Sequence, residues 1–295
     1  MDPIDYSINE ADMITPMQSG AALTADIRQT QVAPGQVAIW WLGQSGYAIK
    51  TASTLFYVDL YLSEHLTNKY ATTAKPHVRI THAPLRGTDV PDVKYVFSSH
   101  KHSDHMDPGT LPDLFAQNPE AKLILPQVNA KHAQLLGIPV DNLITTTGDE
   151  TLQIGPIKVH VLPSAHPTFE YDEDSGYTFI GFVFEVDGVT LYHSGDTIIY
   201  DGLAERLRAF DVDLAFLPIN GSDSRRHELH VPPNMDIDDA LNLAADIGQP
   251  LIVPHHYDMF TFNTVDVQQF IQAADAADAP YRVLQCGEKF IFTAG

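Results

Sequence analysis

The sequence has very little cysteine and no long apolar run. Its single cysteine, Cys286, excludes an internal disulfide and is typical of proteins from a reducing compartment. No segment approaches the roughly 18 consecutive apolar residues of a membrane-spanning helix. The first residues, Met1-Asp2-Pro3-Ile4-Asp5, are acidic and lack the apolar core of a secretory signal. We therefore expect a cytoplasmic protein that does not bind membranes.

Basic residues are also scarce. The chain has 17 Lys and Arg against 38 Asp and Glu, which gives a net charge of −21. This balance disfavours nucleic acid and anionic membrane surfaces as partners. It leaves room for a small anionic substrate, because bound divalent ions can make a site locally positive inside an acidic shell. With 295 residues, the chain is long enough for one large domain or two.

One short segment concentrates groups that bind metals. The apolar run Tyr95–Phe97 is typical of the end of a buried strand, and four polar residues follow it. They are His100, His102, Asp104 and His105. Neutral imidazole and carboxylate are ligands for Zn²⁺, Fe²⁺ and Mn²⁺. Residues two apart on an extended segment point the same way, so His100 and His102 are expected to face one ion.

Three later strand patterns also end in possible ligands. These are His166, Asp196 and the pair His255-His256. Open αβ folds gather their sites at strand ends, so we expect one site with two divalent ions. The first ion would have His100, His102 and His166. The second would have Asp104, His105 and His256, and Asp196 would bridge the two ions. Between His255 and His256 the residues alone do not choose, since only one can face the site.

Such a pair of ions predicts hydrolysis. Two ions about 3.5–4 Å apart can hold a hydroxide and lower its pKa toward neutrality. They can also stabilise the oxyanion that forms when a carbonyl or phosphoryl centre is attacked. Asp104 and Asp196 are the expected catalytic residues. Asp59, at the end of another strand pattern, has two open readings: a carboxylate that supports the ligands, or a turn former.

The remaining sequence predicts two regions. Residues 1–36 are expected to form an N-terminal helical extension, and residues 37–295 one αβ domain with more than one sheet. Residues 61–92 predict a long loop, and Asp107-Pro108 predicts the start of a helix with proline at its first position. The Asp187-Gly188 pair predicts a tight hairpin.

The other predicted elements follow from the same periodicities. Further strands are expected at 37–43, 54–59, 123–126, 157–162, 177–186, 189–193, 212–219, 251–253, 282–284 and 289–292. Further helices are expected at 128–136, 236–247 and 265–274.

Three residues are candidates for holding a substrate. Arg225 and Arg226 form a basic pair that could clamp a phosphate, and the alternative is a solvated charge pair at the surface. Tyr257 follows the expected ligand and could donate a hydrogen bond to an oxyanion. Lys101 is expected to point away from the ligands, toward the surface.

These segments resemble the metallo-β-lactamase superfamily. Its His-x-His-x-Asp-His motif matches residues 100–105, and Tyr192–Asp196 and Pro254–His256 resemble its later ligand segments. The resemblance covers residues 37–292. It implies a four-layer αβ/βα sandwich with the metals at one edge of two sheets, and it favours His256 as the ligand.

A narrower resemblance is to the L-ascorbate-6-phosphate lactonase branch. It rests on residues 32–35, 40–43 and 192–196, on the paired histidines and on the helical leader. It implies a cytoplasmic homo-oligomer that favours Mn²⁺ and hydrolyses the lactone of a phosphorylated sugar acid. Because the ligand types also suit Zn²⁺, we expect two divalent ions, Mn²⁺ or Zn²⁺. Two alternatives stay open: a phosphodiesterase for a small or lipid-derived phosphodiester, and a non-catalytic metal-binding scaffold.

Overall fold

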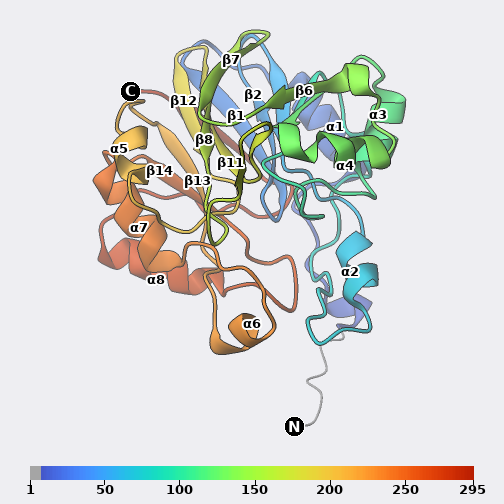
Figure 1. Ribbon diagram of the computed structural model, residues 1–295, viewed down its shortest axis with the longest axis vertical. Coiled ribbons are helices and arrows are strands. Elements are labelled where there is room, and N and C mark those ends of the chain that lie inside the picture. The colour runs from blue at the N-terminus through green and yellow to red at the C-terminus, as the bar shows by residue number, and fades with distance from the viewer. Residues whose placement is uncertain (1–7) are drawn as a thin grey trace.

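The burial of strand β1, Gln36–Gly43, explains the layered fold. From Val37 to Gly43 the strand is buried on both faces. Val37, Ile39 and Trp41 belong to one apolar cluster, and the alternate residues Ala38 and Trp40 to another. Because successive side chains point to opposite faces, this strand must have packed layers on both sides. The computed structural model, which describes residues 8–295, shows those layers (Figure 1).

Two large sheets lie at the centre. The first has the order β15-β1-β2-β3-β4-β5-β6, and the second β14-β13-β12-β11-β8-β7. The other strands of the first sheet are β2 (Gly46–Lys50), β3 (Leu55–Val58), β4 (Tyr95–Phe97), β5 (Lys122–Pro126), β6 (Leu143–Thr146) and β15 (Lys289–Thr293). The second sheet contains β7 (Glu150–Ile154), β8 (Ile157–Pro163), β11 (Ile180–Val186), β12 (Val189–His193), β13 (Leu214–Pro218) and β14 (Leu251–His255). Strands β9 (Tyr171–Asp172) and β10 (Gly176–Tyr177) form a separate small ribbon.

Helices cover the outer faces of both sheets. In Figure 1, α1, α3 and α4 lie on the side of the first sheet, and α5, α7 and α8 on the side of the second. The helices are α1 (Gly20–Gln29), α2 (His65–Tyr70), α3 (Leu111–Gln117), α4 (Ala130–Leu135), α5 (Leu203–Leu207), α6 (Ser224–Glu228), α7 (Ile237–Asp246) and α8 (Val267–Ala276). Short 3₁₀ helices span Glu10–Asp12, Gly87–Asp89, Gln127–Asn129 and Val140–Asn142. This is the expected four-layer αβ/βα sandwich.

Helix α1 packs directly on the first sheet. Its Leu23 and Ile27 are fully buried in the apolar cluster that contains Trp40. The Asp26 carboxylate accepts hydrogen bonds from Trp40 Nε1 at 2.9 Å and from Lys289 Nζ at 2.6 Å. The described part of the N-terminal region is therefore fastened to both β1 and β15. Among the described residues, none of the helices combines the length and apolar character needed to cross a bilayer.

Several element boundaries differ from those expected. Helix α3 begins at Leu111, so the prediction of a helix start at Asp107-Pro108 was wrong. The Asp107 side chain accepts hydrogen bonds from Leu62 N and Ser63 Oγ, and also from Gly109 N and Thr110 Oγ1 in the turn before the helix. The expected loop 61–92 contains helix α2 and a 3₁₀ turn.

Two predicted strands need correction, and two strands were not predicted. The expected strand 282–284 is absent, because the chain pairs with β14 only through an isolated bridge at Tyr281. The strand expected from Tyr177 begins at Ile180. Strands β6 and β7 were not predicted; both carry exposed residues and lie at sheet edges, where the apolar pattern is weak.

Strand direction brings the candidate ligands together. Strands β8 and β12 both run antiparallel to β11, and β13 and β14 run parallel to β12. The ends of β8, β12 and β14 therefore lie at one edge of the second sheet. Strand β4 of the first sheet ends beside them, since Ile180 N donates to Ser99 O at 3.2 Å.

Candidate metal centre

Seven predicted ligands meet at this edge in two groups. The first contains His100, His102, His166 and Asp196, and the second Asp104, His105 and His256. Within each group, the possible ligand atoms lie within 4.8 Å of one another. Residues 99–106 form turns and bends rather than the extended segment expected for His100 and His102. Both histidines nevertheless belong to one group, because the tight turn brings their side chains to the same side.

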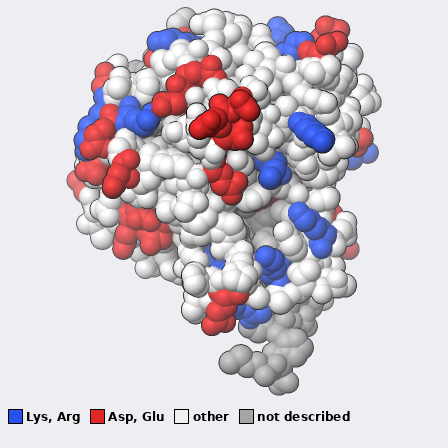
Figure 2. Space-filling view, in the orientation of Figure 1, with Lys and Arg blue, Asp and Glu red and all other residues white. Residues whose placement is uncertain are grey.

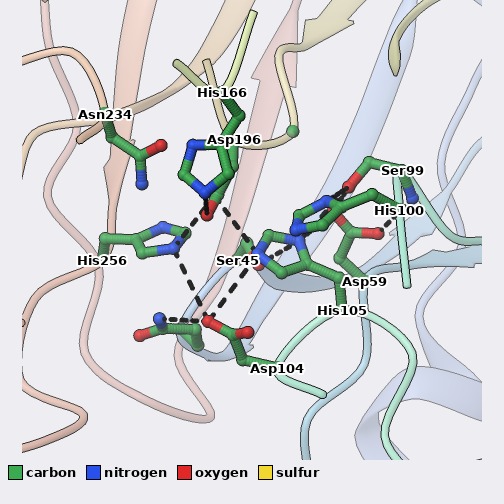
Figure 3. Close-up of polar contacts among 12 residues, drawn as sticks. Ser45, Asp59, Ser99, His100, Asp104, His105, His166, Asp196, Asn234 and His256 are labelled. Carbon is green, nitrogen blue, oxygen red and sulfur yellow. Dashed lines mark hydrogen bonds and ion pairs between the residues drawn. The ribbon is translucent and has the colours of Figure 1, made fainter. Parts of the chain in front are cut away.

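Asp59 holds His105 from behind (Figure 3). The His105 Nδ1–H donates to Asp59 Oδ2 at 2.7 Å, and both side chains are fully buried. Asp59 also accepts hydrogen bonds from Ser99 N and Ser99 Oγ, each at 2.7 Å. A carboxylate in this position fixes the histidine tautomer and leaves Nε2 free to bind a metal. Of the two readings of Asp59, the structure supports the one in which its carboxylate supports a ligand.

Asp196 lies between the two groups. Its Oδ1 is 3.2 Å from His105 Nε2 and 3.0 Å from His256 Nε2, whereas its Oδ2 is 3.5 Å from His166 Nε2. One carboxylate therefore faces both groups. Burial alone would raise the pKa of Asp196, but His256 and His105 outweigh burial and hold it well below the ordinary value.

The turn before Asp196 requires glycine. Gly195 has a φ of +58°, and a Cβ atom there would come within 2.7 Å of both Ile180 O and Ser99 Cβ. A larger residue would push the end of β12 away from the end of β4. Gly195 therefore lets the carboxylate from one sheet approach the histidines from the other.

His166 and His100 each direct one ring nitrogen toward the centre. His166 Nδ1–H donates to Pro233 O at 3.1 Å, so Nε2 points toward Asp196. Burial lowers the pKa of His166 to about 4, although Asp196 opposes this effect. Burial, followed by His105 and His102, holds the pKa of His100 well below its usual value. Neutral imidazole, the form that binds metals, is thus favoured at both positions.

The adjacent histidines at the end of β14 take different places. His256 belongs to the second ligand group and has a φ of +66°, which turns its side chain toward Asp196. His255 lies outside both groups. Its Nδ1 is 2.7 Å from His256 Nδ1, and its ring stacks on His193 at 5.3 Å. If His256 Nδ1 carries the proton, His255 accepts it in a hydrogen bond and keeps His256 Nε2 free.

The donor atoms fit a divalent metal. Among the described residues, His100 Nε2, His105 Nε2, His256 Nε2 and Asp196 Oδ1 are buried without a hydrogen-bond partner. Buried polar atoms without partners are costly, and here they converge on one place. Burial alone would lower the pKa of His105, but Asp196, Asp59 and Asp104 raise it well above the usual value. The same carboxylates that favour a proton on His105 favour a metal cation. The donor set has nitrogen and oxygen and no sulfur, which suits Zn²⁺, Mn²⁺ or Fe²⁺.

A cavity of about 420 Å³ opens onto the centre. His102, Asp104, His166 and Asp196 line its floor. Its walls come from helix α2, the loop after it and residues 231–232 beyond α6. In Figure 1, α2 and α6 project beyond the same end of the two sheets. The volume is typical of a site for a small molecule.

The three predicted substrate-binding residues do not line this cavity. Arg226 is buried, and its guanidinium donates to Asp223 Oδ2 at 2.7 Å and to Asn263 Oδ1 at 3.0 Å. Tyr257 is buried against Trp41, with a ring distance of 4.4 Å, and its hydroxyl donates to Leu284 O. Arg225 lies beside Arg226 in α6. Direct roles for these residues in substrate binding stay predictions. Arg226 does contact Asn263, which lines the cavity.

Sequence reasoning missed several residues around the centre. Gln44 Nε2 donates to Asp104 Oδ2 at 3.0 Å, and Ser99 and Ser45 contact His105 through their hydroxyls. A signal was available for Ser99, because it directly precedes the ligand motif. Gln44 and Ser45 come from the turn between β1 and β2, and only the fold brings that turn to the ligands.

Comparison with known proteins agrees with this geometry. The sequence profile of the beta-lactamase superfamily domain matches residues 56–257. A curated relative from Salmonella gallinarum, named a probable L-ascorbate-6-phosphate lactonase, is 25% identical over 280 residues. That match covers 85% of this chain and 77% of the relative.

Solved structures show the same fold. An isothiocyanate hydrolase from Delia radicum gut bacteria has a TM-score of 0.69 at 18% identity, covering 88% of this chain and 100% of that one. Igni18, described as a metallo hydrolase from Ignicoccus hospitalis, has a TM-score of 0.63 at 21% identity, with 88% and 100% covered. Together with the two ligand groups, these matches show that the chain belongs to the metallo-β-lactamase superfamily and resembles its L-ascorbate-6-phosphate lactonase branch.

Proposed function

We propose that this chain hydrolyses the lactone of a sugar acid in a reaction that depends on two divalent ions, Mn²⁺ or Zn²⁺. The observation that carries the proposal is the place of Asp196, whose two carboxylate oxygens face the two ligand groups. The likeness to the Salmonella lactonase supports the substrate class. A phosphodiester is the competing substrate, since the same kind of centre can attack a phosphoryl group.

The residues around the centre have different roles in the proposed reaction. Two bound ions would supply an activated water and stabilise negative charge on the opened ring. His100, His102 and His166 would hold one ion, Asp104, His105 and His256 the other, and Asp196 would touch both. Asp59, Ser99 and His255 keep the ligand nitrogens oriented. Asp104 and Asp196 also lie in the cavity, where they can hold a proton released from the reacting water.

The test combines metal content with a substrate panel. Protein purified without chelator should carry about two equivalents of Mn or Zn, as expected for a dinuclear centre. The His102→Ala variant should lose most of this metal. A panel of sugar-acid lactones and small phosphodiesters should show ring opening that a chelator abolishes. Phosphodiester cleavage without ring opening would replace the lactone, and metal-loaded protein inactive on both would favour a scaffold.

The proposal also includes the cellular setting. We infer a cytoplasmic homo-oligomer that acts on a small molecule. This inference rests on the resemblance of residues 32–35, 40–43 and 192–196 to the L-ascorbate-6-phosphate lactonase branch. Sedimentation analysis tests this inference, and a monomer at every protein concentration would contradict it.

A further inference from the structure

Three asparagine side chains form a continuous chain of hydrogen bonds beside the cavity. Asn220 follows β13, Asn234 precedes α7, and Asn263 lies in the loop before α8. Asn234 Nδ2 donates to Asn220 Oδ1 at 3.2 Å, and Asn220 Nδ2 donates to Asn263 Oδ1 at 2.9 Å. Asn220 and Asn234 are buried, whereas Asn263 is half-buried and lines the cavity. The amide chain therefore leads from the protein interior to the cavity wall.

Arg226 fixes the direction of this amide chain. Its Nη1 donates to Asn263 Oδ1 at 3.0 Å, and a guanidinium group can only donate hydrogen bonds. The atom of Asn263 that receives this bond must therefore be the amide oxygen, and the same oxygen accepts from Asn220. Because both hydrogen bonds of the Asn263 side chain end at Oδ1, its Nδ2 is left as a donor on the cavity wall.

The donor at the end of the amide chain carries no net charge. The buried Arg226 pairs with Asp223, since Arg226 Nε donates to Asp223 Oδ2 at 2.7 Å. The backbone N of Arg226 donates to the other oxygen of the same carboxylate at 2.8 Å. The ion pair is neutral as a whole, so Arg226 orients Asn263 without placing an unbalanced positive charge beside it. Asn263 Nδ2 is therefore suited to an uncharged acceptor oxygen.

Charged donors at the mouth of the same cavity come from other residues. Lys69, Lys75 and Lys101 line it. Lys101 thus lines the cavity, although the sequence suggested a surface position away from the ligands. In Figure 2, acidic side chains gather mainly over the left half of the face, whereas basic side chains lie around the hollow on the right. The cavity therefore has charged donors on flexible side chains and one uncharged donor, Asn263, whose direction the protein fixes.

The other end of the amide chain lies near the metal centre. Asn234 follows Pro233, whose carbonyl oxygen accepts a hydrogen bond from His166 Nδ1 at 3.1 Å. Figure 3 shows the Asn234 amide pointing toward His166 and His256. Its Oδ1 is buried without a hydrogen-bond partner among residues 8–295. A defect in the amide chain can thus reach the metal centre as well as the cavity, so a test must measure metal content together with substrate binding.

We propose that Asn263 is a specificity-determining residue whose Nδ2–H donates to an uncharged ester oxygen of the substrate, and that Arg226 is the positioning residue that keeps this donor directed into the cavity. The inference rests on the proposed function, because it takes the substrate to be a lactone. The ester group of a lactone has a carbonyl oxygen and a ring oxygen, and both can only accept hydrogen bonds. A fixed N–H favours such a group, whereas an amide that is free to turn can present its own oxygen and repel it.

The test removes the donor in two ways. Asn263→Asp keeps an oxygen that accepts from Arg226 and Asn220, but replaces the N–H on the cavity wall by a carboxylate oxygen. Asn263→Gly removes the donor without adding a charge. Asparagine, aspartate and glycine all tolerate the φ of +57° at this position. The matched control is Asn242→Asp, which adds the same charge at an exposed position of α7 that does not line the cavity.

The values of kcat and KM are measured with metal-loaded protein for the lactone that the unmodified protein hydrolyses best. Both Asn263 variants should lower kcat/KM about tenfold or more, because the ester oxygen loses its donor. Metal content by elemental analysis should stay constant, and Asn242→Asp should match the unmodified protein. An unchanged kcat/KM in Asn263→Gly would overturn the donor. A fall in kcat/KM that follows a loss of metal would also overturn it, because the amide chain would then act through the metal centre.

A double-mutant cycle tests the role of Arg226. Arg226→Met lets the Asn263 amide turn, so the correct orientation becomes only partly populated and kcat/KM should fall about threefold. The same substitution in the Asn263→Asp background should cause no further loss, because Arg226 acts through the amide that is already gone. Additive losses in the double variant would overturn the positioning role of Arg226.

Two probes test the donor without turnover. Cyclopentanone and tetrahydrofuran present the carbonyl oxygen and the ring oxygen of a lactone separately, and neither has an ester bond to hydrolyse. In nuclear magnetic resonance spectra, the side-chain amide signals of Asn263 should shift when one of these probes is added to the metal-loaded protein. The Asn263→Gly variant should bind that probe more weakly. No shift with either probe would overturn the donor.

The inference and the proposed function can therefore fail separately. Probe binding that depends on Asn263, without hydrolysis of any lactone, would sustain the donor and reject the lactonase. Lactones hydrolysed with the same kcat/KM by the unmodified protein and by both Asn263 variants would reject the donor and sustain the lactonase.

Discussion

The floor and the mouth of the cavity differ in how firmly the protein holds their side chains. At the floor, His105 is fully buried and hydrogen-bonded to Asp59 at 2.7 Å, and Asp59 is itself bound by Ser99. At the mouth, Lys69 and Lys101 are exposed, and Lys69 has only a 3.4 Å contact with Ser103. Buried networks of this kind have one geometry, whereas exposed lysines can rearrange around a ligand.

The difference indicates a division between chemistry and selection. The floor is fixed before any substrate arrives, as a metal centre requires, because each ligand must present one nitrogen or oxygen in a set direction. The mouth can change its residues without disturbing that centre. Superfamily members that share the same kind of metal centre can therefore act on different substrates. We expect the residues at the mouth to determine the substrate specificity of this chain.

Loss of the shared carboxylate should have the largest effect. Asp196→Asn removes a charge that faces both ligand groups. A metal centre contributes several kcal/mol to the transition state, so we expect at least about a thousandfold loss of kcat/KM. Elemental analysis should show lower occupancy of both ions. Asp201→Asn, an exposed aspartate five residues further on, is the control. Unchanged metal content in Asp196→Asn would contradict a bridging role.

Replacement of Asp59, which hydrogen-bonds to His105, should have an intermediate effect on metal affinity. Asp59→Asn leaves the backbone intact, because asparagine tolerates the positive φ of +45° at this position. Loss of a supporting carboxylate typically weakens metal binding about 10–100-fold. Competition with a chelator measures this affinity. The control is Asp92→Asn, at another aspartate with positive φ, whose carboxylate pairs with Arg28 at the surface. Equal affinities in the two variants would mean that Asp59 does not support the floor.

Ionic strength should affect substrate binding at the mouth of the cavity more than it affects the metal centre at the floor. Exposed charges are screened as ionic strength rises, whereas buried groups are screened much less. For a phosphorylated substrate, we expect KM to rise several-fold between about 0.05 M and 0.5 M salt, with kcat and metal content nearly constant. Steady-state kinetics with a non-coordinating salt measures this change. A KM independent of salt, or a loss of metal in parallel with activity, would contradict the prediction that salt screens the charges at the mouth and leaves the floor unaffected.

A change far from the cavity should alter stability and not the centre. Burial alone would raise the pKa of Asp26, but hydrogen bonds from Lys289 and Trp40 outweigh it and lower the pKa below 3.8. The ion pair therefore stabilises the fold above pH 3.8, and this contribution is lost as pH falls through the lower folded-state value. Asp26→Asn should cost about 1 kcal/mol near neutral pH and nothing at the acid end. Denaturant unfolding at several pH values measures it. A pH-independent cost would contradict the assignment to charge.

Prediction from sequence succeeded where the signal is local. The motif at 100–105 places four possible ligands within six residues, and any fold that keeps this turn keeps them close. The strand patterns located His166 and Asp196 because each follows an apolar run of a buried strand. The helix expected at Asp107-Pro108 begins only at Leu111, and the Asp107 side chain accepts hydrogen bonds both from residues 62 and 63 and from Gly109 N and Thr110 Oγ1 in the preceding turn, so part of its role depends on a distant segment.

Taken alone, the sequence determined the composition limits, the layered αβ class and the candidate metal ligands, since these depend on residue identity and short-range periodicity. Only the tertiary structure decided which neighbour of a pair faces the centre. His256 turns inward with a φ of +66°, and His255 lies behind it against His193. It also brought Asp59 behind His105 and three lysines around one cavity. The physical reason is that these placements depend on backbone direction and on partners far along the chain, which no local pattern encodes.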